Sequence, residues 1–291
     1  MVEAAGGRLL AVDTSGDPGG RPVFLLHGTP GSRVGPAPRG KVLSLMRVRL
    51  VSFDRPGYGD SARLPGRRVA AAAEDVAAIA DELGLGRFAV VGRSGGGPHA
   101  LACAALLPER VTRAAVLVSP APRDAEGLDW YAGMTASNVR EYRRAELGQP
   151  RIDRPFQLRS RLIRRDPARL IRDLVPELPP TDRTVVADAG VRRMLLSTYR
   201  QAFRYGADGW IDDVMAFLAG WGFAVESIGV PVRLWHGADD QFSPVSHSRW
   251  LADRIPGAEL YLEPGAAHFG AFKELAEAIR WAAAGATAPA G

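Results

Sequence analysis

A serine flanked by glycines carries the strongest chemical signal in this sequence: Gly92-Arg93-Ser94-Gly95-Gly96. The segment follows a continuous apolar run of strand length (FAVV, 88–91) and precedes an apolar stretch of helical length (HALACAALL, 99–107). A nucleophile held in a tight strand-to-helix turn needs neighbours without side chains, which Gly92 and Gly96 provide. Ser94 is then exposed at a helix N-terminus, where the helix dipole favours developing negative charge. The pattern predicts a serine nucleophile; the alternative is a glycine-rich turn with an incidental serine.

Main-chain donors for a negatively charged oxygen are expected beside this serine. The amide of Gly95 follows the nucleophile directly, and a second loop rich in Gly and Pro (HGTPG, 27–31) follows the apolar run PVFLL (22–26). An oxyanion needs donors from both places, and because Pro30 has no N–H, the amide of Thr29 is the second candidate. The imidazole of His27 is expected to hydrogen-bond this loop and to take no part in the chemistry.

Five segments together resemble the α/β-hydrolase superfamily: HGTPG (27–31), DRPGYGDS (54–61), GRSGG (92–96), HGADDQFSP (236–244) and PGAAHF (264–269). Their order and spacing extend over essentially the whole chain. The resemblance implies a catalytic triad of serine, acid and histidine in that chain order. It also implies that the acid follows a late strand and that the histidine follows the last strand.

The family pattern selects the acid from two neighbouring carboxylates. It places the acid three residues after a glycine and four before a proline, and Gly237 and Pro244 both select Asp240. Asp239 remains an alternative, and so does Asp124, because some members of the superfamily carry the acid after the preceding strand. One of the two neighbouring aspartates is expected to serve only the turn.

His268 is the predicted base, because it follows the strand-like run ELYL (259–262) and the turn PGAA, from which a loop can bring its imidazole over Ser94. The other histidines have simpler expected roles. His99 is expected to pack inside a buried helix, His236 to end a strand, and His247 to be solvated near a helix start. No two histidines share a metal-ligand spacing with a carboxylate on the same face. We therefore expect neither a metal ion nor a cofactor.

Two residues beside the nucleophile depart from the family pattern. Arg93 stands where many relatives have histidine or an aromatic residue, and its guanidinium could bind a substrate carboxylate. An ion pair behind the turn is the role we favour for it. Gly95 stands where bulkier residues are common, so the site is expected to be roomier there. Asp54, at the start of the DRPGYG segment, is expected to pin that turn.

Apolar runs of strand length recur along the chain, as is typical of strands covered on both faces of a parallel sheet. They lie at 22–26, 50–53, 88–91, 114–118, 232–235 and 259–262, with helical patterns between them. Residues 1–121 and 228–291 are therefore predicted to form the core, a doubly wound, mostly parallel α/β sheet. Residues 122–227 are Arg-rich and helical without a convincing strand, which predicts a helical cap inserted before the late strands.

Composition limits the other functional classes. The 291 residues include 37 Lys and Arg against 32 Asp and Glu. The excess of +5 lies between 122 and 209, where acids alternate with arginines as on a solvated helix face. No nucleic-acid-binding motif accompanies these charges, so no nucleic-acid partner is expected.

Cys103 is the only cysteine, which excludes an internal disulfide. With no signal-peptide pattern and no long apolar run, we expect a cytoplasmic protein without a membrane partner.

The predicted function is that of an esterase-like serine hydrolase (EC 3.1). It would cleave an ester, lactone or thioester of a small to medium apolar acyl substrate through an acyl-enzyme on Ser94. Epoxide hydrolases and haloalkane dehalogenases of the superfamily use a carboxylate nucleophile, so Ser94 makes both improbable. Carbon–carbon bond hydrolysis or lyase chemistry on this fold remains an alternative, and so does a non-catalytic ligand-binding protein. Aromatic side chains of the predicted cap either fasten it to the core or line a pocket: Trp130, Tyr131, Phe156, Tyr199, Phe203, Tyr205, Trp210, Trp221 and Phe223.

Overall fold

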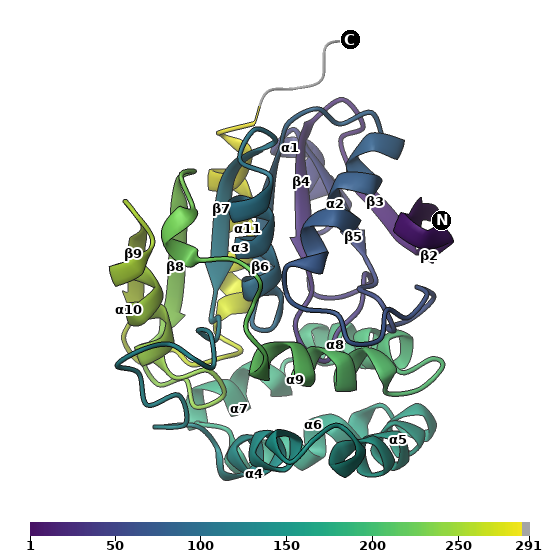
Figure 1. The fold of residues 1–291 in the computed structure, drawn as a ribbon, viewed down its shortest axis with the longest axis vertical. Helices are drawn as coiled ribbons and strands as arrows, with labels where there is room; N and C mark the ends of the chain where they lie inside the picture. The colour runs from purple at the N-terminus through teal and green to yellow at the C-terminus, as the bar shows by residue number, and fades with distance from the viewer. Residues whose placement is uncertain (287–291) are drawn as a thin grey trace.

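A seven-stranded sheet forms the centre of the structure, a computed structural model that describes residues 1–286 (Figure 1). Across the sheet the strands are β3 (Val12–Gly16), β5 (Val48–Phe53), β4 (Arg21–Leu26), β6 (Phe88–Arg93), β7 (Val111–Leu117), β8 (Val232–Gly237) and β9 (Glu259–Glu263). β3 is antiparallel to β5, and the other neighbours are parallel. The predicted mostly parallel α/β sheet is confirmed. Residues 287–291, the end of the predicted core, lie outside the described residues.

Helices cover both faces of this sheet. α2 (Ala71–Glu82), α3 (Gly96–Leu106) and α10 (Val245–Arg254) pack on one face, and α1 (Gly40–Leu45) and α11 (Ala271–Ala283) pack on the other. Along β4, Phe24 and Leu26 join the first apolar layer, while Val23 and Leu25 join the second. Successive side chains of a strand point to opposite faces, so a strand buried on both sides must be apolar throughout.

The first residues of the chain add strands that the sequence analysis did not predict. β1 (Val2–Ala4) and β2 (Arg8–Leu10) form a small antiparallel pair joined by a 3₁₀ turn (Ala5–Gly7), and β1 packs against α2. β3 was not predicted either. Within residues 1–286, no helix combines the length and the apolar character needed to cross a membrane.

Residues 122–227, called the helical segment below, lie between β7 and β8. They form α4 (Ala136–Glu146), α5 (Pro150–Arg165), α6 (Ala168–Leu174), α7 (Pro180–Ala187), α8 (Ala189–Ala202) and α9 (Asp208–Leu218), with 3₁₀ turns at Val175–Glu177 and Val225–Ser227. None of these residues is in a strand. The helices form a layer across one end of the sheet (Figure 1). They share a cavity with the loops that follow β4, β6, β8 and β9, so they cover the carboxyl ends of these strands.

The helical segment has an apolar cluster of its own, and α5 shows why. Its buried residues Ile152, Phe156 and Ile163 recur at helical spacing and form one apolar stripe. The arginines of α5 lie on the remaining surface, and most of them are exposed: Arg151, Arg154, Arg161, Arg164 and Arg165. The arginine-rich composition of this helix thus corresponds to a solvated face, as expected. Tyr58 and Phe269 join the cluster from outside the helical segment.

Candidate active site

Ser94 lies in a sharp turn between β6 and α3. Its φ of +53° falls in the left-handed region, which is strained for a residue with a side chain. A Cβ at position 92 would lie 2.7 Å from the carbonyl carbon of Gly96, and a Cβ at position 96 would lie 2.7 Å from the carbonyl oxygen of His27. The turn therefore requires glycine at both positions. It leaves Ser94 at the N-terminal end of α3.

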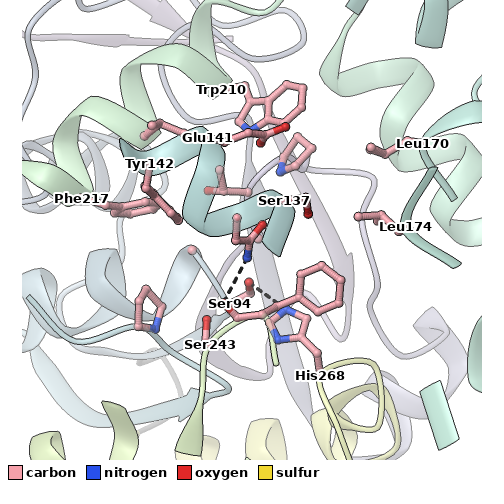
Figure 2. Close-up of a pocket in the computed structure, with 18 of the residues that line it drawn as sticks. Ser94, Ser137, Glu141, Tyr142, Leu170, Leu174, Trp210, Phe217, Ser243 and His268 are labelled. Atoms are coloured by element: carbon pink, nitrogen blue, oxygen red, sulfur yellow. Dashed lines mark hydrogen bonds between the residues drawn. The ribbon is translucent and has the colours of Figure 1, made fainter. Parts of the chain in front are cut away.

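The side chains of Ser94, His268 and Asp240 lie in one hydrogen-bonded row. Nε2 of His268 is 3.0 Å from Oγ of Ser94 (Figure 2), and Nδ1 of His268 is 2.8 Å from Oδ2 of Asp240. His268 comes from the loop between β9 and α11, and Asp240 from the loop between β8 and α10. Because an ionised carboxylate can only accept, Nδ1 carries the proton and Nε2 can accept from the hydroxyl of Ser94. The structure thus brings together the three residues that the family resemblance selected.

Asp240 is buried and satisfied by several donors. Its Oδ1 accepts from the amides of Phe242 at 2.8 Å and Ser243 at 3.1 Å, and Nε2 of His236 lies 3.3 Å from its Oδ2. Burial alone would raise the pKa of this carboxyl, but the electrostatic interaction with His268 and the hydrogen bonds from His236 and His268 lower it below its usual value. Asp240 is therefore ionised at neutral pH and can stabilise a positive charge on His268.

Neither alternative acid takes the place of Asp240 beside the histidine. Asp239 and Asp124 have exposed side chains, and neither is hydrogen-bonded to His268 among the described residues. Asp54 has the expected structural role. Its carboxylate accepts from the amide of Asp60 at 3.1 Å, which closes the DRPGYG turn.

Thr29 and Gly95 pack against each other beside Ser94. Thr29 belongs to the loop after β4, and both residues line the same cavity as Ser94. Within residues 1–286 neither amide N–H has a main-chain acceptor. Because a main-chain N–H is an obligatory hydrogen-bond donor, an oxygen atom in the cavity can take the place of the missing acceptor.

The expectation of a roomier site at Gly95 is wrong. A Cβ at this position would lie 2.7 Å from the Cβ of Thr29 and 3.0 Å from the ring of Phe217. These two side chains already fill the space. Glycine at position 95 instead allows the loop after β4 to approach the turn that holds Ser94.

The guanidinium of Arg55 fixes the orientation of the Thr29 amide. Its Nη1 donates to the carbonyl of His27 and its Nη2 donates to the carbonyl of Gly28 at 3.2 Å. The carbonyl of Gly28 and the N–H of Thr29 belong to one planar peptide group and point in opposite directions. Holding this carbonyl therefore directs the N–H of Thr29 away from Arg55.

A buried charge cluster centred on Asp213 of α9 lies beneath the same loop. Asp213 accepts from Arg55, from Arg67 at 2.6 Å, from the hydroxyl of Tyr58 at 2.9 Å and from the hydroxyl of Thr29. Burial alone would raise the pKa of Asp213, but the two guanidinium groups hold it well below its usual value. Two cations therefore face one carboxylate. This cluster was not predicted from the sequence.

His247 is not solvated, and that expectation is wrong. Its ring is buried, with Nδ1 accepting from the amide of Ala121 at 2.9 Å and Nε2 lying 3.1 Å from the carbonyl of Trp130. Burial lowers the pKa of His247 to about 4, so the ring is neutral at pH 7. His99 is buried inside α3 and His27 hydrogen-bonds its own loop, as expected.

Arg93 does not form the ion pair that we favoured for it. The described part of the chain places no carboxylate within ion-pair distance of its guanidinium, and its Nε has no hydrogen-bond partner there. Its Nη2 donates to the carbonyl of His268 at 3.2 Å, and the guanidinium lies 4.2 Å from the ring centroid of Phe272. Burial lowers the pKa of Arg93 to about 10. Its positive charge therefore persists at neutral pH, beside the loop that holds His268.

A cavity of about 130 Å³ lies over Ser94 and His268, between the strand ends and the helical segment. Apolar and aromatic side chains form two of its sides. Figure 2 shows Leu170 and Leu174 of α6 on one side and Tyr142 and Phe217 on the other. None of these four residues was predicted from the sequence to line the site.

The end of the cavity away from Ser94 is polar. Glu141 lies there next to Trp210 (Figure 2), and its carboxylate pairs with the guanidinium of Arg159. Ser137 and Asn138 of α4 add further polar groups to the lining. The cavity therefore combines apolar sides with a hydrogen-bonding end.

The aromatic residues of the helical segment serve both expected roles, because some line the cavity and Trp221 packs in the apolar cluster of the core. Of the nine that the sequence analysis named, Tyr199 and Trp210 line the cavity. Phe156 and Phe203 pack on Trp210, with ring centroids 4.3 and 5.5 Å away, and so support the cavity wall. Tyr205 is 73% exposed and lies in neither place.

Sequence comparison relates this chain to known proteins at low identity. The chain is 26% identical over 266 residues to the dihydrolipoyllysine-residue acetyltransferase component of an acetoin cleaving system from Pseudomonas putida. The aligned region covers 90% of this chain but only 62% of that protein's length. It is 28% identical over 235 residues to a pimeloyl-[acyl-carrier protein] methyl ester esterase from Nitrosomonas europaea, covering 76% of the chain and 79% of that esterase. It is 28% identical over 259 residues to a 2-hydroxymuconate semialdehyde hydrolase from Pseudomonas putida, covering 84% of the chain and 79% of that hydrolase.

The fold comparison agrees with this relationship. A thermophilic esterase from Thermogutta terrifontis superimposes with a TM-score of 0.70 at 22% identity, over 98% of each chain. The family described as alpha/beta hydrolase fold matches residues 21–275. That match includes nearly all of the central sheet and the loops that carry Ser94, Asp240 and His268. The chain is therefore a member of the α/β-hydrolase family.

Proposed function

We propose that this protein is a serine hydrolase that cleaves an ester-like bond through an acyl-enzyme on Ser94. The observation that carries the proposal is the row from Ser94 through His268 to Asp240 at the floor of a cavity. His268 would take the proton of Ser94 as its oxygen attacks the carbonyl carbon, and Asp240 would stabilise the imidazolium. His268 would then protonate the leaving group and activate the water that releases the acid.

The amides of Thr29 and Gly95 are the proposed donors to the oxyanion. Each such donor contributes about 3 kcal/mol in other enzymes of this chemistry. Both residues line the cavity and neither N–H group has a main-chain acceptor within residues 1–286, which supports this role. Arg55 and Arg67, which together outweigh the charge of Asp213, add a favourable field beneath the developing negative charge.

The cavity supports a small substrate. A water molecule needs about 10–15 Å³ of such space, so 130 Å³ corresponds to about ten non-hydrogen atoms. We therefore propose a short-chain ester, lactone or thioester, in the carboxylic-ester hydrolase class (EC 3.1). Its apolar body would lie between Leu170 and Phe217, with a polar group directed toward Glu141 and Arg159. The helical segment then serves as a cap over the substrate.

Covalent labelling tests the nucleophile. A fluorophosphonate should add once to the wild-type chain, as measured by intact mass, and should not add to Ser94→Ala. Ser15→Ala, which alters an exposed serine of β3, is the matched control and should be labelled like the wild type. Absence of labelling in the wild type would favour a non-catalytic binding protein.

A series of p-nitrophenyl esters tests the substrate class. Turnover should be highest for short acyl chains and should fall once the chain outgrows the cavity. Efficient fluorophosphonate labelling with negligible turnover of every ester would overturn the ester assignment and favour carbon–carbon bond cleavage on the same nucleophile.

A further inference from the structure

The peptide bond that follows His268 is held at both ends. Its carbonyl oxygen, which belongs to His268, accepts from Nη2 of Arg93 at 3.2 Å. Its N–H, which belongs to Phe269, donates to Oδ1 of Asp182 at 2.9 Å, and the next amide, of Gly270, donates to the same oxygen at 3.2 Å. Arg93 comes from the end of β6, beside the nucleophile, whereas Asp182 comes from α7 of the helical segment.

Asp182 is an unusual residue to bury. Its side chain is fully buried, and its Oδ2 has no hydrogen-bond partner within residues 1–286. No cation there lies within ion-pair distance of its carboxylate. A buried carboxylate with one unpartnered oxygen costs stability, so a contribution to folding alone does not account for it.

The side chain of Phe269 connects the same loop to the helical segment. Its ring is buried in the apolar cluster of α5, α6, α8 and α9 and lies 5.8 Å from the ring of His268. The residue after the histidine is therefore fixed to the helical segment through its side chain and through its N–H. Because a peptide group is planar, fixing the bond after His268 restricts the backbone from which the imidazole extends.

We infer that Asp182 and Arg93 are positioning residues for His268. They hydrogen-bond the N–H and the carbonyl of the peptide bond that follows His268, and so hold its imidazole in line with Ser94. This inference rests on the proposed function, in which His268 is the base. It gives the helical segment a second task besides covering the substrate. Docking of α7 against the loop completes the placement of the base, so the site is fully assembled only when the helical segment is in place.

The test compares aspartates of the helical segment that both accept main-chain N–H groups. Asp182→Ala removes the carboxylate that accepts the N–H groups of the loop after His268. Asp188→Ala is the matched control, because Asp188 caps α8 by accepting from the amides of Gly190 and Val191. For p-nitrophenyl butyrate, kcat of Asp182→Ala should fall about 10- to 100-fold with KM changed less than about twofold, since small misplacements of catalytic groups have such effects. Asp182→Asn keeps an acceptor oxygen and should restore most of kcat. Asp188→Ala should lower the melting temperature without changing kcat.

Arg93→Met provides a second route if Asp182→Ala does not fold. It keeps much of the volume beside Phe272 but removes the donor to the carbonyl of His268, so kcat should again fall with KM unchanged. A folded Asp182→Ala or Arg93→Met with wild-type kcat would overturn the inference, as would equal losses in Asp182→Ala and Asp188→Ala. If the wild type is nevertheless labelled by the fluorophosphonate, the proposed function stands and only the positioning role of Asp182 and Arg93 fails. A wild type that neither hydrolyses esters nor labels would overturn both.

Discussion

Replacing Asp240 by asparagine tests how the carboxylate controls the proton on His268. Oδ1 of Asp240 accepts from two main-chain amides, so the asparagine carbonyl must take that position and its NH₂ group must face Nδ1 of His268. The NH₂ group can only donate, which forces the imidazole proton to Nε2. Nε2 then points a hydrogen at Ser94 and can no longer accept its proton. A reversal of this kind costs about 10⁴-fold in kcat, or about 5 kcal/mol in activation free energy.

The assay is steady-state hydrolysis of a short p-nitrophenyl ester, with circular dichroism and thermal unfolding to confirm that Asp240→Asn is folded. Asp239→Asn is the matched control, because it makes the same change at the exposed neighbouring residue. It should keep near-wild-type kcat. The reasoning is refuted if folded Asp240→Asn retains kcat within about tenfold of the wild type, or if Asp239→Asn suffers the larger loss.

Further predictions concern the loop after β4 and the buried histidine. Gly95→Ala places a methyl group 2.7 Å from the Cβ of Thr29, so turnover and fluorophosphonate labelling should both fall sharply; wild-type labelling would contradict the geometry. Thr29→Val removes the hydroxyl that donates to Asp213 and should lower the free energy of unfolding in urea by about 1–3 kcal/mol, whereas Thr29→Ser should retain most of it. His247 has a folded-state pKa of about 4, below its ordinary value of 6.5, so its contribution to stability is complete above pH 6.5 and is lost as the pH falls toward 4. The loss should reach about 3 kcal/mol in urea titrations, and His247→Gln should show a correspondingly smaller pH dependence.

Features that depend on neighbours in the sequence were predictable. The apolar run that became β4 indicated a strand buried on both faces, because both sets of alternating residues are apolar. The glycines around Ser94 indicated the turn, because backbone atoms approach positions 92 and 96 too closely for any Cβ. β3 was missed because its sequence, VDTSG, is polar and lies at the sheet edge, where burial does not impose an apolar pattern.

Features that depend on distant partners were not predictable in this way. Asp182 and Asp213 act on loops that are far from them in sequence, and only the packed structure shows what they contact. One local signal was present, because Asp212 and Asp213 interrupt the apolar helix sequence WIDDVMAF, and charges in such a place require buried partners. Arg93 and His247 were misjudged for the same reason, since Arg93 packs on a ring of α11 and His247 hydrogen-bonds Trp130 of the helical segment.

The most direct test of the account is to trap the acyl group on the chain. Acid quenching during the first turnovers of p-nitrophenyl acetate, followed by tryptic digestion, should yield acetylated peptide 94–110, in which Ser94 is the only serine. A burst of p-nitrophenol of about one equivalent should accompany this adduct. Turnover that leaves no acetyl group on Ser94, or that places it on another residue, would contradict the account.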